Sequence, residues 1–332
     1  MLTIGVSGLT GMIGRNLILE SRRRPEAAGG IRWVAFVRSV SQTDFLRQHQ
    51  VELRGLDYEE PQSMAGKVED LDAFIHLAGL TKSPRPVEFY TANTRSTETV
   101  LRALKRYGRR LRHFLFSSSI SAAGPSRSPD HLKSESEPCN PVSEYGRSKL
   151  RAEQLIGDSG LPWTVIRFPI VFGPFDRDGL FLLRLARLGW SGCFGAEENC
   201  FSYLFAQDAA ALMLRIVGDG RLFGGVYNLC YDQPCRTSEF VSRVRAELGL
   251  PGQIRCFRLP RWFGRLAARF LAGWQGLIGK ASITNAEKIG EILAGSWTAS
   301  NRKIREALNI ASIQEQGALA ETVRWFRERG LL

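Results

Sequence analysis

The chain of 332 residues is 44% hydrophobic, which is typical of a globular protein with one large or two interleaved domains. Its net charge of +12, from 45 basic and 33 acidic residues, is compatible with a nucleic acid, a membrane surface or an anionic small molecule as partner. Since the arginines are scattered over most predicted helices, with no basic motif interleaved with aromatic residues, we expect solvated helix faces and no nucleic-acid partner.

The cysteine and histidine patterns predict neither disulfides nor a metal site. The six cysteines form no C-x-x-C pair, and the four histidines form no H-E-x-x-H motif. No apolar run reaches the roughly 18 residues of a membrane span, and a strand pattern begins too near residue 1 for a signal peptide. We therefore expect a cytoplasmic protein with free thiols.

The chain begins with a predicted strand over residues 2–6, a glycine-rich turn over 8–14 and a helix. Glycines at three-residue intervals permit a tight turn, close approach of a pyrophosphate to backbone N–H groups, and close packing of helix on strand. The spacing is Gly-x-x-Gly-x-x-Gly rather than the commoner Gly-x-Gly-x-x-Gly. The residues predicted to bind a dinucleotide here are Gly8, Thr10, Gly11, Met12, Ile13 and Gly14.

The second predicted strand, residues 31–37, ends at Arg38. An acidic residue at this place would bind the adenosine ribose of NAD, whereas a guanidinium offers a fork of donors to a 2′-phosphate. The sequence thus favours NADP(H) over NAD(H), the alternative being that Arg38 is only a solvated strand end.

Two further strands are predicted at residues 51–53 and 73–77, and a long helix at 87–107. Asp57 follows the first of these strands and is placed to contact the adenine, while Leu77, Ala78 and Gly79 form a turn of small residues across which a cofactor can lie. The helix carries Asn93. Because strands and helices alternate, we predict an α/β protein with a Rossmann-type, doubly wound parallel sheet.

A fifth strand, residues 113–116, runs into the serines 117–119, and a later helix carries Tyr145 and Lys149 four positions apart. That spacing puts both side chains on one helical face. An ammonium group near a phenol lowers the pKa of the phenol from about 10, which prepares it for proton transfer. The serines end a parallel strand, so their hydroxyls are expected in the same crevice. The alternatives are an exposed helical pair and ordinary turn serines.

After a sixth strand at 164–167, the alternation breaks. Helices are predicted near 180–188, 208–217, 237–248, 260–274, 284–293 and 313–329, and a strand at 226–229. We expect a dinucleotide-binding domain over residues 1–170, with returning segments near 200–230, and a smaller, partly helical substrate-binding lobe over 171–332.

Residues 260–280 form an amphipathic basic segment. Trp262, Leu266, Phe270 and Trp274 recur every four positions, and arginines form a separate stripe. Such a helix can pack on the lobe or on a second subunit, cover an apolar substrate, or lie on an anionic membrane surface. All three readings stay open here.

Several motifs occur in order along nearly the whole chain. They are Gly8-Leu9-Thr10-Gly11-Met12-Ile13-Gly14, His76-Leu77-Ala78-Gly79, Phe116-Ser117-Ser118-Ser119, Tyr145-x-x-x-Lys149, Arg167-Phe168-Pro169-x-Val171-Phe172-Gly173-Pro174, and the segments 205–210 and 226–229. Together they resemble the extended short-chain dehydrogenase/reductase superfamily, often labelled NAD-dependent epimerase/dehydratase.

The resemblance implies roles for these residues. Tyr145 would be the catalytic acid/base, Lys149 would lower its pKa and hold the nicotinamide ribose, and Ser119 best matches the catalytic serine, with Ser118 as its neighbour and competitor. The glycines would hold the pyrophosphate, Asp57 the adenine and Arg38 the 2′-phosphate. Asn93, Phe168 and Val171 would lie near the cofactor, although Asn93 is equally compatible with a helix-surface or buried hydrogen-bonding role.

Departures from subfamily patterns narrow the chemistry. Ile120 and Ser121 stand where 4,6-dehydratases need an Asp-Glu pair, no cysteine lies near the serines as reductoepimerases require, and Ile170 replaces an Asn that contacts nucleotide sugars. The chain therefore looks closer to the branch with dihydroflavonol-reductase-like, steroid-dehydrogenase-like and hopanoid-associated enzymes.

We accordingly predict an NAD(P)-dependent oxidoreductase that transfers a hydride between nicotinamide and a carbinol or ketone carbon of a small, apolar or lipid-like substrate. One alternative is a nucleoside-diphosphate-sugar epimerase acting by transient oxidation. Another is a non-catalytic dinucleotide-sensing or assembly protein, and a homodimer is left open.

Overall fold

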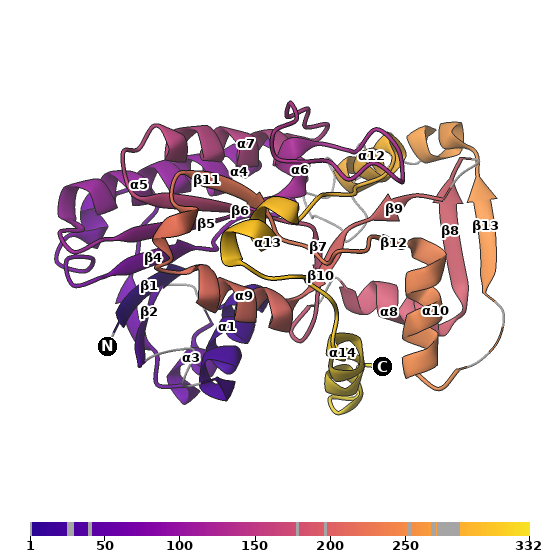
Figure 1. Cartoon of the computed structure of the whole chain (residues 1–332), viewed down its shortest axis with the longest axis horizontal. Coiled ribbons are helices and arrows are strands. Elements are labelled where there is room, and N and C mark those ends of the chain that lie inside the picture. The colour runs from indigo at the N-terminus through magenta and orange to yellow at the C-terminus, as the bar shows by residue number, and fades with distance from the viewer. Residues whose placement is uncertain are drawn as a thin grey trace.

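The computed structural model describes residues 2–24, 30–38, 42–176, 179–195, 198–250, 252, 254–266, 270 and 286–332. Its centre is a seven-stranded parallel sheet in the order β11-β6-β5-β4-β1-β2-β3 (Figure 1). The strands are β1 (Leu2–Ser7), β2 (Ile31–Val37), β3 (Glu52–Gly55), β4 (Ala73–His76), β5 (His113–Ser119), β6 (Trp163–Phe168) and β11 (Gly225–Asn228). The predicted Rossmann-type fold is confirmed.

The order of the strands creates a crevice at the carboxyl edge of the sheet. From β1 the chain moves outward through β2 to β3, and then crosses back to β4 on the other side of β1. Ligands of doubly wound sheets bind where the winding reverses in this way. The predicted glycine turn after β1 and the small-residue turn after β4 therefore lie side by side.

Helices cover both faces of the sheet (Figure 1). On one face lie α1 (Met12–Arg23), α3 (Asp44–Gln48) and α9 (Ala206–Ile216), and on the other α4 (Pro86–Phe89), the π-helical segment η2 (Tyr90–Arg95), α5 (Ser96–Tyr107) and α7 (Glu144–Gly157). Strand β5 shows why both faces are needed: Leu115 packs in one buried cluster, while Phe114 and Phe116 pack in the other. Alternate side chains of a strand point to opposite faces, so a sheet apolar on both sides requires two helical layers.

The predicted helix over 87–107 changes its geometry part of the way along. Residues 86–107 are helical throughout, but the turns from Tyr90 to Arg95 have π geometry. Two side-chain hydroxyls compete there with backbone N–H groups for carbonyl oxygens. Ser96 Oγ donates to Ala92 O, and Thr97 Oγ1 donates to Asn93 O, each at 2.6 Å. The expected long helix is therefore present, with π instead of α geometry in these turns, and π turns are frequent at functional sites.

The remaining elements form a smaller lobe at one end of the sheet, the segments that link the lobe to the sheet, and two short 3₁₀ turns that pack on the sheet domain. They are α6 (Ile120–Ala123), β7 (Ile170–Phe172), α8 (Gly179–Arg187), β8 (Trp190–Phe194), β9 (Cys200–Phe201), β10 (Tyr203–Phe205), β12 (Cys235–Arg236), α10 (Thr237–Glu247), β13 (Arg255–Leu259), α12 (Ala286–Ala294), α13 (Arg302–Leu308), α14 (Ala318–Arg327), and the short 3₁₀ turns η1 (Pro61–Met64) and η3 (Gly220–Leu222). Three two-stranded sheets, β10-β7, β12-β9 and β13-β8, join them. The sequence analysis predicted none of the strands of these three small sheets.

The segments around 200–230 return to the main sheet. Helix α9 packs on α1, and β11 pairs with β6 in parallel. Of the predicted helix at 260–274, residues 261–266 and 270 are described and helical, residue 260 is described and not helical, and residues 267–269 and 271–274 lie outside the described residues.

Candidate active site

The glycine turn between β1 and α1 lies against the turn after β4. Gly8 has φ +82°, and a Cβ there would lie 2.5 Å from the backbone nitrogen of Ala78. A Cβ on Gly14 would lie 2.5 Å from the Cα of Leu9. Helix α1 begins after Gly11 without a side-chain cap, which leaves its first N–H groups and its dipole available to an anion. These features fit the pyrophosphate of a dinucleotide.

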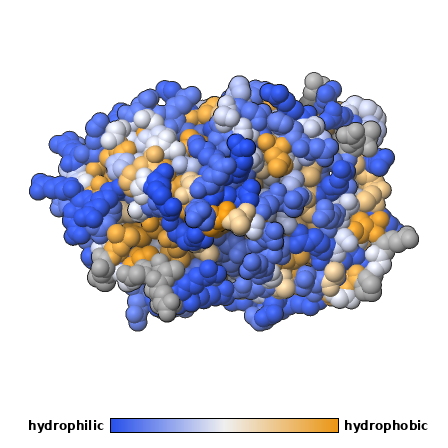
Figure 2. Space-filling model, in the orientation of Figure 1, coloured by the Kyte–Doolittle hydropathy of each residue, from blue (hydrophilic) through white to orange (hydrophobic). Residues whose placement is uncertain are grey.

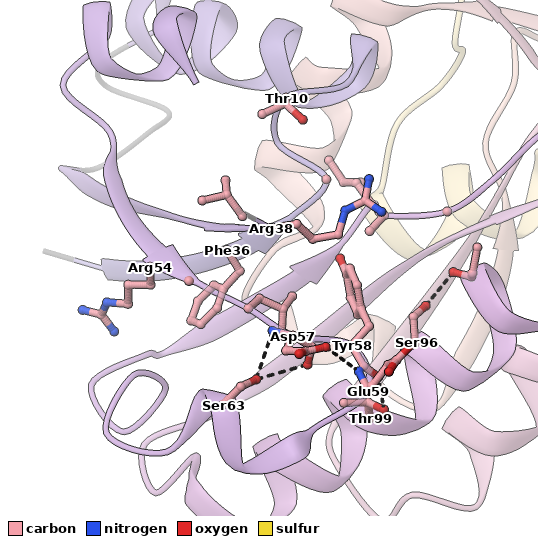
Figure 3. A pocket seen from close by; sticks show the side chains of 18 of the residues that line it. Thr10, Phe36, Arg38, Arg54, Asp57, Tyr58, Glu59, Ser63, Ser96 and Thr99 are labelled. Carbon is pink, nitrogen blue, oxygen red and sulfur yellow. Dashed lines mark hydrogen bonds between the residues drawn. The ribbon is translucent and has the colours of Figure 1, made fainter. Parts of the chain in front are cut away.

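A cavity of about 1560 Å³ extends from this turn across the carboxyl ends of β1, β2 and β3 (Figure 3). Eight of the residues predicted to bind the cofactor line it: Gly8, Thr10, Gly11, Arg38, Asp57, Leu77, Ala78 and Gly79. The other seven do not line this cavity: Met12, Ile13, Gly14, Asn93, Lys149, Phe168 and Val171. Gly14 acts through packing, and the contacts of Phe168 and Val171 with a cofactor stay predictions.

The far end of the cavity carries the groups expected to meet the adenosine half. Arg38 is exposed at the end of β2, and its guanidinium lies near the hydroxyl of Tyr58 (Figure 3). Burial raises the pKa of Tyr58 to about 12, against the opposite effects of a hydrogen bond with Ser7 and of Arg38. Asp57 Oδ1 accepts a hydrogen bond from the backbone N–H of Glu59 at 2.9 Å. Our sequence reasoning missed Tyr58, although an aromatic residue directly after Asp57 was a readable signal.

Asn93 is a buried structural residue. Its Oδ1 accepts from Leu80 N at 2.7 Å, and its Nδ2 donates to Leu80 O at 3.0 Å and to Ser148 Oγ at 2.9 Å. The amide thus ties the turn after β4 to helix α7. Of the roles left open by the sequence, the structure favours the buried hydrogen-bonding one.

Helix α7 and the end of β5 bring together the hydroxyls of Tyr145 and Ser119. Ser143 caps the helix by accepting from Gly146 N at 3.1 Å, which starts the helix one turn before Lys149. Ser119 is the last residue of β5, and its hydroxyl lies close enough to the phenol to lower the pKa of Tyr145. Two hydroxyls this close can share a substrate oxygen atom.

Ser118 faces the other way. Its Oγ donates to Glu153 Oε1 at 2.5 Å, and the same carboxylate pairs with Arg167 at 2.6 Å in the buried interior. Neighbouring residues of a strand point to opposite faces. Ser119 therefore points toward the crevice, while Ser118 points to the other face and hydrogen-bonds the carboxylate of this ion pair. The geometry therefore favours Ser119 over its competitor.

The lowering of the Tyr145 pKa by Lys149 stays a prediction. Burial raises the pKa of Tyr145, and the groups that oppose the rise are the ammonium of Lys288 and the hydroxyl of Ser119. Lys149 Nζ donates to Ser117 O at 2.7 Å and lies 4.6 Å from the centre of the Phe116 ring. Burial lowers the pKa of Lys149 itself to about 8. Its predicted contact with the nicotinamide ribose stays a prediction.

In the described part of the chain, no group of three or more His, Cys, Asp and Glu side chains could hold a metal ion. The six cysteines are free thiols. Within the same residues, no helix combines the length and apolar character needed to cross a bilayer.

Comparison with known proteins gives one family and two relatives that match over their full length. A model of the NAD dependent epimerase/dehydratase family matches residues 4–230. Ceramide reductase of Caulobacter vibrioides (strain NA1000 / CB15N) is 25% identical over 330 residues, covering 99% of this chain and 96% of that protein. Sterol demethylase protein B of Methylococcus capsulatus (strain ATCC 33009 / NCIMB 11132 / Bath) is 24% identical over 354 residues, covering all of both chains.

Among solved structures, MoeE5 in complex with UDP-glucuronic acid and NAD superposes with a TM-score of 0.71. It is 21% identical and covers 98% of this chain and 99% of that one, which shows a shared fold.

Proposed function

Because the chain belongs to the NAD dependent epimerase/dehydratase family, we propose that it is a reductase that delivers a hydride to the carbonyl carbon of an apolar or lipid-like ketone. The observation that carries the proposal is the meeting of the Ser119 and Tyr145 hydroxyls at the carboxyl edge of the sheet, beside a dinucleotide-sized cavity. The names of the two full-length relatives, a ceramide reductase and a sterol demethylase protein, support the lipid-like substrate.

The residues of the chain would handle the oxygen and its proton. Ser119 would donate a hydrogen bond to the substrate oxygen and fix its position. As the carbonyl is reduced, the O–H bond of Tyr145 breaks, its proton passes to the substrate oxygen, and the phenolate remains. When bound, the nicotinamide supplies the hydride. Since burial raises the pKa of Tyr145, the phenol is protonated near neutral pH, which is the state that can donate a proton during reduction.

Net oxidation of the cofactor separates this proposal from an epimerase. We expect NADPH absorbance to fall when a long-chain or sterol ketone, dispersed in detergent, is added to the protein. A nucleoside-diphosphate-sugar epimerase, which the family name keeps as the second proposal, would co-purify with its cofactor and convert a UDP-sugar with no net absorbance change. Ketones that leave NADPH unconsumed while a UDP-sugar is epimerised would decide for the second proposal.

We propose NADP(H) as the preferred cofactor, on the position of Arg38 at the cavity. A charge-assisted hydrogen bond to a 2′-phosphate is worth about 1.5–3 kcal/mol. Arg38→Ala should therefore weaken NADPH binding about tenfold or more and leave NADH binding nearly unchanged, as measured by calorimetry. Arg102→Ala is the matched control, because Arg102 lines the same cavity but pairs with Glu98 at 2.6 Å. An intact preference for NADPH in Arg38→Ala would refute the cofactor proposal.

We also propose that the amphipathic basic segment contacts an anionic bilayer surface. Its described aromatic side chains are exposed, Trp262 at 63% and Phe270 at 70%, and Figure 2 shows hydrophobic surface at the end of the molecule where Figure 1 places β8 and β13. Between Glu247 and Glu287 the sequence has no acidic residue, while it has five arginines and one lysine. Exposed aromatic rings beside positive charges, with no negative charge among them, match an anionic membrane interface.

Vesicle sedimentation tests the bilayer contact. We expect the protein to pellet with phosphatidylglycerol-containing vesicles at low salt, and the double variant Trp262→Ser/Phe270→Ser to bind about tenfold more weakly. Leu132→Ser/Val142→Ser, which changes two exposed apolar side chains elsewhere, should bind like the wild type. Equal binding to anionic and neutral vesicles, or binding to neither, would contradict the proposal.

A further inference from the structure

Helix α12 is attached to the first turn of α7, the turn that carries Tyr145. The carboxylate of Glu287 accepts from the backbone N–H groups of Glu144 at 3.2 Å and of Tyr145 at 3.3 Å. The carboxylate of Glu291 accepts from Ser143 Oγ at 2.7 Å. The two bonds of Glu287 satisfy N–H groups that a helix start leaves without intrahelical partners. Both carboxylates place negative charge at the positive end of the α7 dipole.

This attachment fixes the position of a lysine beside the phenol. Lys288 lies between the two glutamates in sequence, and its Nζ is 5.5 Å from the centre of the Tyr145 ring. Nζ also donates to Glu291 Oε2 at 2.8 Å. The lysine side chain is 39% exposed, so it lies partly open to solvent while the phenol beneath it is buried.

We propose that Lys288 is a positioning residue for the reaction: a second ammonium group, carried by α12 to the catalytic tyrosine, that sets how readily the phenol releases its proton. The proposal rests on the proposed role of Tyr145 and extends it. A cation within about 6 Å of an aromatic ring interacts with it favourably, and it interacts more strongly with a phenolate, because opposite charges attract. Lys288 thereby favours the state of Tyr145 that follows proton transfer.

Among the described residues, the other groups around Tyr145 do not duplicate this role. From its own helix, Lys149 turns to Ser117 O. From α4, the apolar ring of Phe89 packs at 6.0 Å between centres, and from β5 the nearby hydroxyl of Ser119 carries no charge.

Burial raises the pKa of Tyr145 most. From α12, the carboxylate of Glu291 raises it further, because its negative charge repels a phenolate. Both carboxylate oxygens of Glu287 accept hydrogen bonds from the backbone of α7. Although burial by itself lowers the pKa of Lys288, the effects of Glu291, Tyr145 and Glu287 together outweigh it, so the pKa lies above its ordinary value and the ammonium stays charged near neutral pH.

The test observes the phenol directly and needs no substrate. The protein is labelled with ¹³Cζ-tyrosine, and the resonance of Tyr145 is identified as the one missing from Tyr145→Phe. We expect the titration midpoint of this resonance to rise by about one pH unit or more in Lys288→Met, because an opposite charge at this range shifts a pKa by that amount. Lys288→Arg, which keeps the charge, should titrate close to the wild type.

A matched control is available in the same chain. Lys303 Nζ lies 4.6 Å from the centre of the Tyr227 ring and is not among the groups that act on the pKa of Tyr145, so Lys303→Met should leave the Tyr145 midpoint unchanged. An unshifted midpoint in Lys288→Met, or a wild-type phenol that stays protonated until alkaline unfolding, would overturn the role of Lys288. If Tyr145→Phe turned out fully active, the proposed function would fail instead, while a shifted midpoint would still establish the electrostatic contact.

Discussion

Replacing Tyr145 by Phe is expected to reduce ketone reduction about a thousandfold while NADPH affinity changes less than about twofold. The variant removes one hydroxyl, and a general acid of this kind contributes about 10²–10⁴ to the rate. The ring itself remains and still packs on Phe89, so the fold and the cavity are preserved. The measurement is steady-state NADPH oxidation together with calorimetric binding of NADPH.

Tyr90→Phe is the control for this result. The hydroxyl of Tyr90 donates to Glu144 Oε2 at 2.8 Å, one residue from Tyr145, and its loss should leave turnover near the wild-type value. Turnover that falls equally in both variants would indicate a general disturbance of the start of α7. Normal turnover in Tyr145→Phe would remove the tyrosine from the mechanism.

The second large effect is expected at the glycine turn. Gly8→Ala should lower NADPH affinity at least about a hundredfold, because the new Cβ would meet the backbone nitrogen of Ala78 at 2.5 Å and the carbonyl carbon of Leu77 at 2.7 Å. Backbone cannot move aside as a flexible side chain can, so the two turns that form the pyrophosphate cradle must separate. Calorimetry with NADPH and thermal unfolding measure the two consequences.

Backbone strain alone is isolated by Gly160→Ala. Gly160 has φ +72°, much like the +82° of Gly8, but a Cβ there would meet nothing within 4 Å. This control should lose only about 1–2 kcal/mol of stability from the left-handed conformation and keep full cofactor affinity. Equal losses of affinity in both variants would show that strain, and not the close approach of the turns, explains the effect.

The sequence was sufficient for features that depend on local chemistry. The glycines at 8, 11 and 14 were readable, because only the absence of a Cβ permits such a turn between a strand and a helix. The sheet followed from the alternation of elements. Ser119 could also have been separated from Ser118 by the two-residue period, had the fifth strand been extended to its true end at residue 119.

Features that depend on distant packing were beyond the sequence. The four-residue spacing of Tyr145 and Lys149 put both on one face of α7, but it could not show that burial of the phenol outweighs a nearby charge or that Lys149 turns to Ser117. Nor could the helical pattern of 284–293 show that this helix attaches to α7 and brings Lys288 to the ring. Such contacts arise from tertiary structure and leave no local period.

Hydride transfer is tested most directly by following the hydride itself. With NADPH that carries deuterium at both C4 positions and an apolar ketone, we expect the alcohol product to contain one deuterium on its carbinol carbon. The label should appear about a thousandfold more slowly in Tyr145→Phe. An alcohol formed without deuterium at that carbon, or no transfer to any ketone tested while NADPH binds normally, would contradict the reductase mechanism.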